Sequence, residues 1–498
     1  MLGTLLREDH SPTLATDQYQ LTMAHGYWKN GMAEREASFH MFFRKMPFGG
    51  GYVVAAGLDT AIDLLQAFRF TASDLTYLGG LRDRADHPLF EERFLRYLEE
   101  LRFACDVMAV PEGTPVFPAE PLVRVEGPIL QAQLLETLLL NTLNFQSLIA
   151  TKAARICIEA KGEPVIDFGL RRAQGFDGGL SASRACFVGG CQGTSNVLAG
   201  KLLGIPVYGT HAHSWVMAFD SELEAFEAYA RAMPDNCLFL VDTYGTLNGI
   251  KNAITVAQGL RERGHEIIGL RLDSGDLAYF SIHARRMLDE AGFPAAAILA
   301  SNELDEYVIR SLKDQGARIS VWGVGTKLVT AYDDPALSGV YKLAAVRSAA
   351  DRRWQYKLKL SEQRSKISVP GIHQVHRYAD EGGRFMADAI VDVDEDIARV
   401  AEIVDPNDNT KTKTVRRYPR REPLLQPIFE RGRLVYRRPA LPEIQARTIA
   451  QLALLDDSHK RLEFPHIYPV GLSTHLNQVR DDMIRRERAR ISGNHNGH

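Results

Sequence analysis

The chain has 498 residues, of which 45% are hydrophobic and 24% are charged, and its formal net charge at pH 7 is −3. This is the composition of an ordinary folded protein, and the near balance of charge argues against bulk attraction to nucleic acid or to a membrane surface. The five cysteines are odd in number and include no C-x-x-C pair. This pattern argues against disulfides and structural zinc, and it predicts a reducing, cytoplasmic location. Residues 1–10 contain charges and no long apolar core, so we expect no signal peptide.

The first part of the chain, residues 1–130, mixes helical and strand-like patterns and predicts a small α+β domain. Thr16 can cap a helix over residues 20–30, and residues 37–43 alternate like a strand. Residues 131–162 then keep a helical period and predict a long helical spine, made of one bent helix or of two helices. Because this apolar stretch also carries charged side chains, we expect it to be packed against protein and not to span a membrane.

Residues 164–346 differ from the first part because short apolar strand patterns alternate with helical ones. The strand patterns lie at 164–168, 205–208, 237–241, 267–272, 297–300 and 319–322, and a polar cluster follows each of them. Short, largely apolar strands are typical of a parallel sheet that is covered on both faces. The polar clusters would then meet at one end of the sheet. The pattern predicts an α/β fold: an irregular parallel α/β barrel domain over 131–346, whose site lies at the carboxyl ends of its strands.

The remaining residues, 347–498, are less regular and predict a C-terminal extension that packs beside the barrel and partly joins the N-terminal domain. Strands on either side of Arg431 and Gly432 are expected to pair with each other. We expect an arginine-rich terminal helix over residues 474–490 and disorder over residues 492–498.

The polar cluster after the strand pattern at 205–208 contains two histidines. Its sequence is Gly209-Thr210-His211-Ala212-His213-Ser214, and a capping pattern that begins at Ser221 marks the next helix. Polar residues between the carboxyl end of a strand and the next helix commonly carry the chemistry of α/β enzymes. The turn at Gly209 leaves the relative direction of the two imidazoles open, and no third metal ligand lies nearby. A pair of hydrogen-bonded structural histidines fits this pattern equally well.

Two further clusters indicate a site for phosphate. In the segment Gly323-Val324-Gly325-Thr326, the glycines would let backbone N–H groups approach a phosphate, and the Thr326 hydroxyl would add a donor. A tight turn between strand and helix is the alternative. Arg171 and Arg172, at the end of the first strand pattern, would neutralise phosphates at a barrel mouth, although adjacent arginines on a surface loop are usually solvated.

The strand pattern at 267–272 ends in a pair of charged residues that share one strand face, Arg271 and Asp273. Arg271 could bind a carboxylate or a phosphate through two parallel hydrogen bonds. Asp273, with Asp276, could hold Mg²⁺ or the hydroxyls of a ribose, and a salt bridge inside the barrel is the alternative. Tyr19 and Tyr244 could stack on a flat ring, and plain packing is the alternative for Tyr19. Together the clusters predict an enzyme that handles anions, in particular phosphates.

Several segments, taken together, resemble the nicotinate phosphoribosyltransferase family, and most closely its longer branch. They are residues 16–23 (TDQYQLTM), 42–44, 47–50, 167–174 (DFGLRRAQ), 195–197, 209–214, 271–277 (RLDSGDL) and 323–326. Their order and spacing match the family from about residue 12 to residue 346, and the resemblance continues more faintly to the end.

The resemblance implies that nicotinate and phosphoribosyl pyrophosphate react to give nicotinate mononucleotide and pyrophosphate, the first step of NAD salvage from nicotinate. It implies that ATP is a co-substrate that phosphorylates a histidine, and that Mg²⁺ is a cofactor. It also implies a homodimer with shared active sites and small-molecule substrates, in which the N-terminal tyrosine reaches the neighbouring subunit. The residues concerned are His213 for the phosphoryl group; Tyr19, Thr210 and Arg271 for nicotinate; Arg171, Gly323, Gly325 and Thr326 for the phosphoribosyl group; and Asp273 for Mg²⁺.

Two other functions remain compatible with the sequence. An enzyme of the same barrel type could act on nicotinamide or quinolinate in place of nicotinate. A non-catalytic relative could sense a nucleotide or hold a partner, although the retention of Tyr19, His213 and Arg271 together argues against it.

Overall fold

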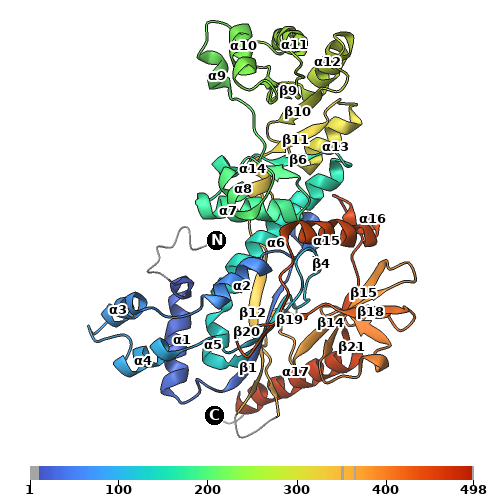
Figure 1. Ribbon diagram of the computed structural model, residues 1–498. Coiled ribbons are helices and arrows are strands. Elements are labelled where there is room, and N and C mark those ends of the chain that lie inside the picture. The colour runs from blue at the N-terminus through green and yellow to red at the C-terminus, as the bar shows by residue number, and fades with distance from the viewer. Residues whose placement is uncertain (1–10, 349–352, 364–365, 496–498) are drawn as a thin grey trace. The chain divides into compact units, whose positions relative to one another are not determined.

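The computed structural model describes residues 11–348, 353–363 and 366–495. The chain divides into two compact units: unit 1 combines Met1–Leu148 with Ala336–His498, and unit 2 is Ile149–Pro335. Figure 1 colours unit 2 from teal to yellow. The segment in which we expect no signal peptide and the last three residues of the segment expected to be disordered lie outside the described residues. Among the described residues, no helix is long and apolar enough to cross a membrane.

Unit 1 is built on one antiparallel sheet and one mixed sheet, in which β15 and β21 are parallel. Within the described residues, one sheet has the strand order β13-β12-β1-β5-β3-β19-β20 and the other the order β17-β16-β21-β15-β14-β18, while β2 and β4 form a separate pair. The strands are β1 (Glu36–Phe43), β2 (Val53–Val54), β3 (Asp106–Ala109), β4 (Pro115–Val116), β5 (Val123–Pro128), β12 (Gly339–Arg347), β13 (Gln355–Tyr356), β14 (His373–Ala379), β15 (Phe385–Asp392), β16 (Glu402–Val404), β17 (Thr412–Thr414), β18 (Arg420–Pro423), β19 (Gln426–Glu430), β20 (Arg433–Leu434) and β21 (Val470–Ser473).

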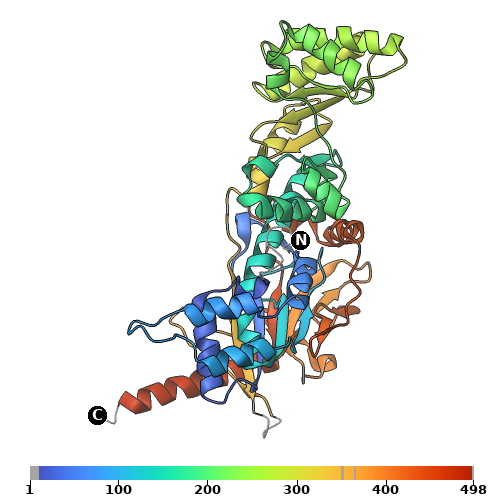
Figure 2. The same cartoon turned by 60° about the vertical axis from the view of Figure 1, so that its left-hand side comes forward.

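The helices of unit 1 include the expected N-terminal helix and the expected terminal one. They are η2 (Pro12–Leu14), α1 (Gln18–Lys29), η3 (Pro47–Gly49), α2 (Leu58–Gln66), α3 (Ala72–Gly80), α4 (Glu92–Glu100), α5 (Ile129–Leu134), η6 (Ile397–Arg399), α15 (Leu441–Leu454), α16 (Asp457–Lys460) and α17 (Thr474–His495), with the first half of α6 (Glu136–Glu159). The expected spine is therefore two helices, α5 and α6. The terminal helix continues into the segment in which we expected disorder, and its C-terminal end extends away from the rest of unit 1 (Figure 2).

Unit 2 is built on a parallel sheet, so the parallel α/β prediction is confirmed. Residues 149–335 are all described, and their six strands have the order β7-β6-β11-β10-β9-β8. Every neighbouring pair in this sheet is parallel. Its elements are β6 (Val165–Asp167), η4 (Leu170–Arg172), α7 (Gly175–Val188), β7 (Gly193–Thr194), α8 (Val197–Leu203), α9 (His213–Met217), α10 (Glu222–Ala232), β8 (Leu238–Leu240), α11 (Thr246–Glu262), β9 (Gly269–Leu272), α12 (Leu277–Glu290), β10 (Ala297–Ser301), α13 (Glu306–Asp314), β11 (Val321–Val324) and α14 (Thr326–Val329).

The expected strand at 205–208 is reduced to one bridge, from Val207 to Thr194 at the end of β7. Pro206 contributes to this loss because it has no backbone N–H for a ladder. The segment that follows reaches the opposite edge of the sheet through side chains. The Thr210 hydroxyl donates to the Leu238 carbonyl at 2.5 Å, and the backbone N–H of Leu240 donates to His211 at 3.2 Å. Side chains therefore connect the two edge strands, β7 and β8, where a regular barrel would have a ladder.

The boundaries of the units differ from the predicted boundaries at 130 and 346. Helix α5 and the first part of α6 belong to unit 1, and so does β12, which pairs with β1 along its whole length. The C-terminal strands β19 and β20 extend the same sheet, and they pair around Arg431 and Gly432 as expected. The pairing of β12 with β1 and that of β19 with β3 join residues some 300 positions apart in the chain. Local periodicity does not reveal such contacts.

Candidate active site

Unit 2 contains a cavity of about 480 Å³ at the carboxyl ends of its strands. It is lined by Phe168, Leu170, Arg171, Phe176, Ser195, Gly209, Thr210, Ala212, His213, Leu240, Arg271 and Asp273. Five of the residues that the sequence singled out therefore share one cavity: Arg171, Thr210, His213, Arg271 and Asp273. This is the position at which parallel α/β proteins bind their ligands.

Arg271, on β9, is held before any substrate binds. Its Nε donates to the Ser301 hydroxyl at 2.8 Å, and its Nη2 donates to Asp273 Oδ1 at 2.8 Å. Only 14% of its side chain is exposed. Among the described residues, no partner is found for its remaining nitrogen, Nη1. The guanidinium is thus fixed in direction and keeps a donor for an anion.

Asp273 remains ionised because its neighbours stabilise the carboxylate. Burial alone would raise its pKa, but hydrogen bonds from Ser301 and Arg271, together with nearby His213, hold the pKa of Asp273 below its ordinary value. Its Oδ1 accepts from both Ser301 and Arg271. Its Oδ2 lies 3.8 Å from Nε2 of His213. One carboxylate therefore contacts both the cationic group and the candidate catalytic histidine.

His213 is the first residue of α9, and 41% of its side chain is exposed. Its Nδ1 lies 3.1 Å from the Thr243 hydroxyl. When Nδ1 carries the proton and donates to Thr243, the lone pair of Nε2 is free on the side of Asp273. A neutral imidazole with one nitrogen anchored and the other accessible is suited to nucleophilic or acid–base work.

His211, in contrast, has a structural environment. It is 7% exposed, and its ring packs near Phe226, Tyr229 and Phe239. Its Nε2 accepts the Leu240 N–H, so that lone pair is already used. Burial lowers the pKa of His211 to about 4, which keeps the ring neutral. Of the two histidines that the sequence left open, only His213 lines the cavity.

The other predicted residues lie in three different settings. Thr210 lines the cavity, but its hydroxyl donates to Leu238. Gly323 is buried on β11, and Gly325 and Thr326 begin α14; none of the three lines the cavity. Tyr19 lies on α1 in unit 1 and is 47% exposed.

Comparisons with known proteins agree with the resemblance in the sequence. Models of nicotinate phosphoribosyltransferase match the chain three times: the N-terminal domain at residues 14–144, the family model at 164–352 and the C-terminal domain at 372–480. The chain is 45% identical to the nicotinate phosphoribosyltransferase of Bacillus subtilis, over 94% of each chain. The chain belongs to the nicotinate phosphoribosyltransferase family.

Animal relatives also span nearly all of the chain. The nicotinate phosphoribosyltransferase of Bos taurus is 36% identical and covers 95% of this chain and 97% of its own. The crystal structure of human nicotinic acid phosphoribosyltransferase superposes with a TM-score of 0.83 at 34% identity, covering 94% of this chain and 99% of that one. The architecture of the two units is therefore that of the family.

The site of this nicotinate phosphoribosyltransferase family member also contains residues that sequence reasoning left without a role. Phe168 and Phe176 present aromatic rings to the cavity, and the guanidinium carbon of Arg271 lies 5.6 Å from the centre of the Phe168 ring. Ser301 and Thr243 orient Arg271 and His213. All except Phe176 lie at or just beyond the carboxyl end of a strand. The same positional rule that identified Arg271 could therefore have identified Phe168, Thr243 and Ser301.

The carboxylates fit a magnesium ion that binds together with phosphates. Among the described residues, no group of three or more His, Cys, Asp or Glu side chains is arranged to hold a metal. Asp242 accepts from the Asp273 N–H at 2.9 Å through Oδ2, and its buried Oδ1 has no hydrogen-bond partner in the described part of the chain. Magnesium commonly uses one or two carboxylates together with substrate phosphates and water. Asp242 and Asp273 could supply these carboxylate ligands.

Proposed function

We propose that this chain transfers the phosphoribosyl group of phosphoribosyl pyrophosphate to nicotinate, and that ATP hydrolysis is coupled to the transfer. The observation that carries the proposal is the cavity in which Arg271, Asp273 and His213 converge in a chain of this family. A flat pyridine carboxylate needs a cation and an aromatic face, and a pyrophosphate leaving group needs further positive charge.

Nicotinate is expected to bind with its carboxylate on Arg271 and its ring near Phe168. The fixed direction of the guanidinium and the unpartnered Nη1 support this role for Arg271. A charge-assisted hydrogen bond in a partly buried site is worth about 1.5–3 kcal/mol. Nicotinamide has no carboxylate, so a preference for nicotinate follows from the same contact.

In the transfer step, the lone pair of the pyridine nitrogen forms a bond to C1 of the ribose as the bond from C1 to pyrophosphate breaks. The electron pair of the broken bond leaves with the pyrophosphate. Positive charge develops on the sugar and negative charge on the leaving group, so Arg171 is expected to stabilise pyrophosphate. Gly325 and Thr326 are expected to hold the phosphoribosyl moiety. Magnesium held by Asp242 and Asp273 would supply further charge neutralisation of the pyrophosphate when bound.

His213 is expected to take the phosphoryl group from ATP. Its Nε2 lone pair would form the N–P bond as the bond from the γ-phosphorus to the bridging oxygen breaks, with the electron pair leaving on ADP. A hydrogen bond donated by Nδ1 to the Thr243 hydroxyl would hold the tautomer that this attack requires. Water would later cleave the N–P bond and release phosphate.

The assembly and location belong to the same proposal. We expect a homodimer in the cytoplasm in which Tyr19 of one subunit completes the site of the other. The exposure of Tyr19 on α1 and the odd number of cysteines, with no C-x-x-C pair, are consistent with these expectations.

The decisive experiment combines substrate choice with labelling. The purified chain should form nicotinate mononucleotide from nicotinate, phosphoribosyl pyrophosphate and ATP, and it should be much less active with nicotinamide or quinolinate. Labelling with γ-labelled ATP should give an acid-labile, base-stable label.

His213→Asn should abolish this label and the coupled ATP hydrolysis, because an amide cannot carry the phosphoryl group. A slow ATP-independent transfer should survive, because Arg271 and the phosphate contacts remain to orient the substrates. His211→Gln serves as the control and should keep the label. Label that persists in His213→Asn, or that maps to His211, would contradict this role.

A further inference from the structure

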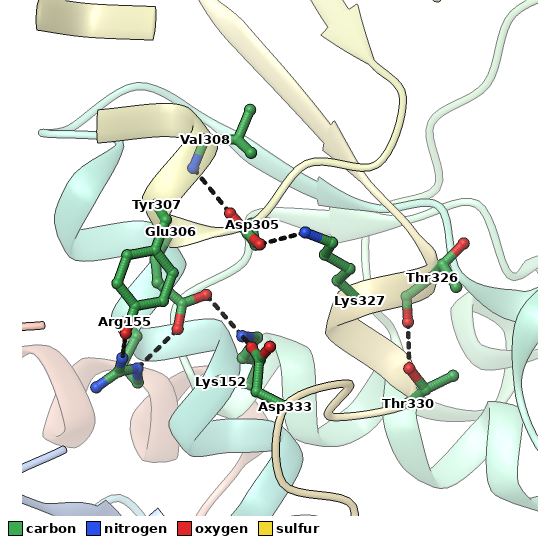
Figure 3. Close-up of polar contacts among 10 residues, drawn as sticks. All are labelled: Lys152, Arg155, Asp305, Glu306, Tyr307, Val308, Thr326, Lys327, Thr330 and Asp333. Carbon is green, nitrogen blue, oxygen red and sulfur yellow. Dashed lines mark hydrogen bonds and ion pairs between the residues drawn. The ribbon is translucent and has the colours of Figure 1, made fainter. Parts of the chain in front are cut away.

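Unit 2 contains a buried ionic network next to the segment that carries Gly325 and Thr326. Lys152, on α6, is fully buried, and its Nζ lies 2.9 Å from Glu306 Oε2 and 2.6 Å from Asp333 Oδ2. Arg155, one turn later on the same helix, donates to Glu306 at 2.8 Å. Figure 3 shows these side chains converging from α6, from the start of α13 and from the segment after α14.

A second contact of the same network involves the residue before Glu306. Asp305 caps α13 by accepting the Val308 N–H at 2.8 Å through Oδ1. Its Oδ2 accepts from Lys327, on α14, at 2.5 Å. Figure 3 shows the Asp305 carboxylate between the start of α13 and the ammonium group of Lys327. Asp305 is thus shared between the loop after β10 and the segment after β11.

The six charges of the network balance. Lys152, Arg155 and Lys327 are the cations, and Asp305, Glu306 and Asp333 are the carboxylates. Burial disfavours charged Lys327, but the hydrogen bond that Lys327 donates to Asp305, together with the negative charge of Asp305, outweighs burial and raises the pKa of Lys327. Burial alone would raise the pKa of Asp333, but the hydrogen bond that Asp333 accepts from Lys152 holds this pKa below its ordinary value. Lys327 and Asp333 therefore remain ionised near neutral pH.

Stability alone is a weak reason for such a network. Removing two charges from water costs about as much as their attraction returns, so buried ion pairs add little net stability, and apolar replacements often serve as well. What an ion pair provides is a fixed geometry between the elements that it joins. Here the segment from Gly325 to Asp333 is fastened at two points, at Lys327 to the loop after β10 and at Asp333 to α6.

We propose that Asp305 and Lys327 are positioning residues that hold the Gly325–Thr326 segment in the conformation that binds the phosphoribosyl substrate. The inference rests on the proposed function, because it assumes that this segment contacts that substrate. Lys327 acts through its bond to Asp305 and not as a ligand itself. Its ammonium group is already paired, and it does not line the cavity. The segment that precedes it must be correctly placed, because small displacements of binding groups reduce transition-state binding strongly.

The test compares four variants with wild type. Asp305→Asn keeps an acceptor for the Val308 N–H, so the cap of α13 survives while the charge is lost. Lys327→Met keeps the length of the side chain. The double variant Asp305→Asn/Lys327→Met leaves no unpaired buried charge and guards against loss of folding. Lys327→Arg should restore the pair.

Lys313→Met is the matched control. Lys313 lies on α13, the helix that Asp305 caps. Its Nζ lies 2.7 Å from Oε2 of Glu163, a residue that precedes β6 and does not belong to the Gly325–Thr326 segment. Its side chain is 16% exposed, compared with 22% for Lys327. The two lysines are therefore similarly buried and form ion pairs of similar length, although Glu163 (31% exposed) is less buried than Asp305 (6%). Only Lys327 lies next to the segment.

The readout is the KM for each substrate, with thermal unfolding as a check. Asp305→Asn, Lys327→Met and the double variant should each raise the KM for phosphoribosyl pyrophosphate about tenfold or more, the size of a lost charge-assisted bond. The KM for nicotinate should stay near that of wild type. The effects should not add in the double variant, because both changes break one contact. Lys327→Arg and Lys313→Met should resemble wild type.

Three results would overturn the proposal. The first is an equal rise of both KM values, which indicates general damage. The second is an unchanged KM for phosphoribosyl pyrophosphate in the folded double variant. The third is a rise in Lys327→Met without one in Asp305→Asn, which would make Lys327 a direct ligand. Failure of the proposed function would look different, because wild type itself would then lack the activity.

Discussion

Arg271 owes its usefulness to the groups that surround it. An arginine on a flexible surface must lose side-chain entropy when it binds an anion, whereas Ser301 and Asp273 have already fixed this guanidinium. The same contacts leave one nitrogen for a ligand. A prearranged donor of this kind separates substrates by whether they carry a carboxylate.

Replacing this side chain tests the nicotinate contact. Arg271→Ala should raise the KM for nicotinate by roughly 10- to 100-fold, because a charge-assisted bond worth about 1.5–3 kcal/mol is lost. Steady-state kinetics with nicotinate as the varied substrate would measure the change. Arg172→Ala is the control, because Arg172 is exposed and does not line the cavity. Unchanged KM and kcat in Arg271→Ala would show that Arg271 does not bind the nicotinate carboxylate.

The second residue-scale consequence concerns pH and His211. In the unfolded chain the pKa of this imidazole has its ordinary value of 6.5, whereas burial lowers it to about 4 in the folded protein. Between pH 6.5 and pH 4 the unfolded chain binds a proton that the folded protein does not bind. The contribution of His211 to the free energy of unfolding is therefore fully present above pH 6.5 and is lost as the pH falls towards 4. The full contribution is roughly 3 kcal/mol.

The measurement is the urea midpoint of unfolding at pH 7.5 and at pH 5. Wild type should lose more stability between the two than His211→Gln, which can still accept the Leu240 N–H but does not titrate. The other buried histidines are common to both proteins and cancel in the comparison. Equal losses in the two proteins would show that His211 does not titrate as its burial requires.

At the scale of elements, the contact between β6 and β11 explains Gly323 in a way that the sequence did not suggest. The sequence predicted that this glycine lets a phosphate approach the backbone. In the structure, a Cβ at Gly323 would lie 2.7 Å from the ring of Phe168, which follows the neighbouring strand β6. The absence of a side chain therefore makes room for an aromatic ring of the cavity.

Gly323→Ala should accordingly displace Phe168. We expect a higher KM for nicotinate and a loss of stability of about 1–3 kcal/mol, the usual cost of overpacking. Gly245→Ala is the matched control, because a Cβ at Gly245 would meet nothing within 4 Å. Gly245 lies in the loop after β8, a strand of the same sheet. Kinetics and thermal unfolding of both variants would decide. Selective loss of phosphoribosyl pyrophosphate binding in Gly323→Ala would instead favour the original interpretation.

Elements and site were predictable to different degrees. Alternating strands and helices place polar residues at one end of a parallel sheet, and this rule alone brought Arg271, Asp273 and His213 to one cavity. The rule says nothing about which side chain turns inward, so it did not separate His211 from His213. The family resemblance favoured His213, and of the two only His213 lines the cavity. The rule also could not foresee the pairing of β12 with β1, because that contact is far apart in the chain.

At the scale of the whole molecule, the proposed homodimer with shared sites predicts that two defective variants can complement each other, which an enzyme whose site lies within one chain could not do. Tyr19→Ala and His213→Ala should each lack the ATP-coupled activity. Mixing them under conditions of subunit exchange should restore one working site in each heterodimer, because each subunit then supplies what the other lacks.

The measurement is activity as a function of mixing ratio, with exchange verified by differently tagged subunits. A maximum near equal amounts is expected. Mixtures in which exchange is verified but activity does not return would show that Tyr19 and His213 do not act across a subunit boundary.

The joint between β7 and β8 has a consequence for local unfolding. Ladder strands separate only when several backbone bonds break together, whereas this joint depends on one bridge at Val207 and on two side chains, Thr210 and His211. Regions with few backbone bonds open at a lower free energy than the core. This is therefore the place where we expect unit 2 to open first, which would expose the amides around Leu240 to hydrogen exchange. Because Thr210 and His211 flank the cavity wall, a bound ligand that steadies them would also slow that exchange, and protection there would report occupancy of the site.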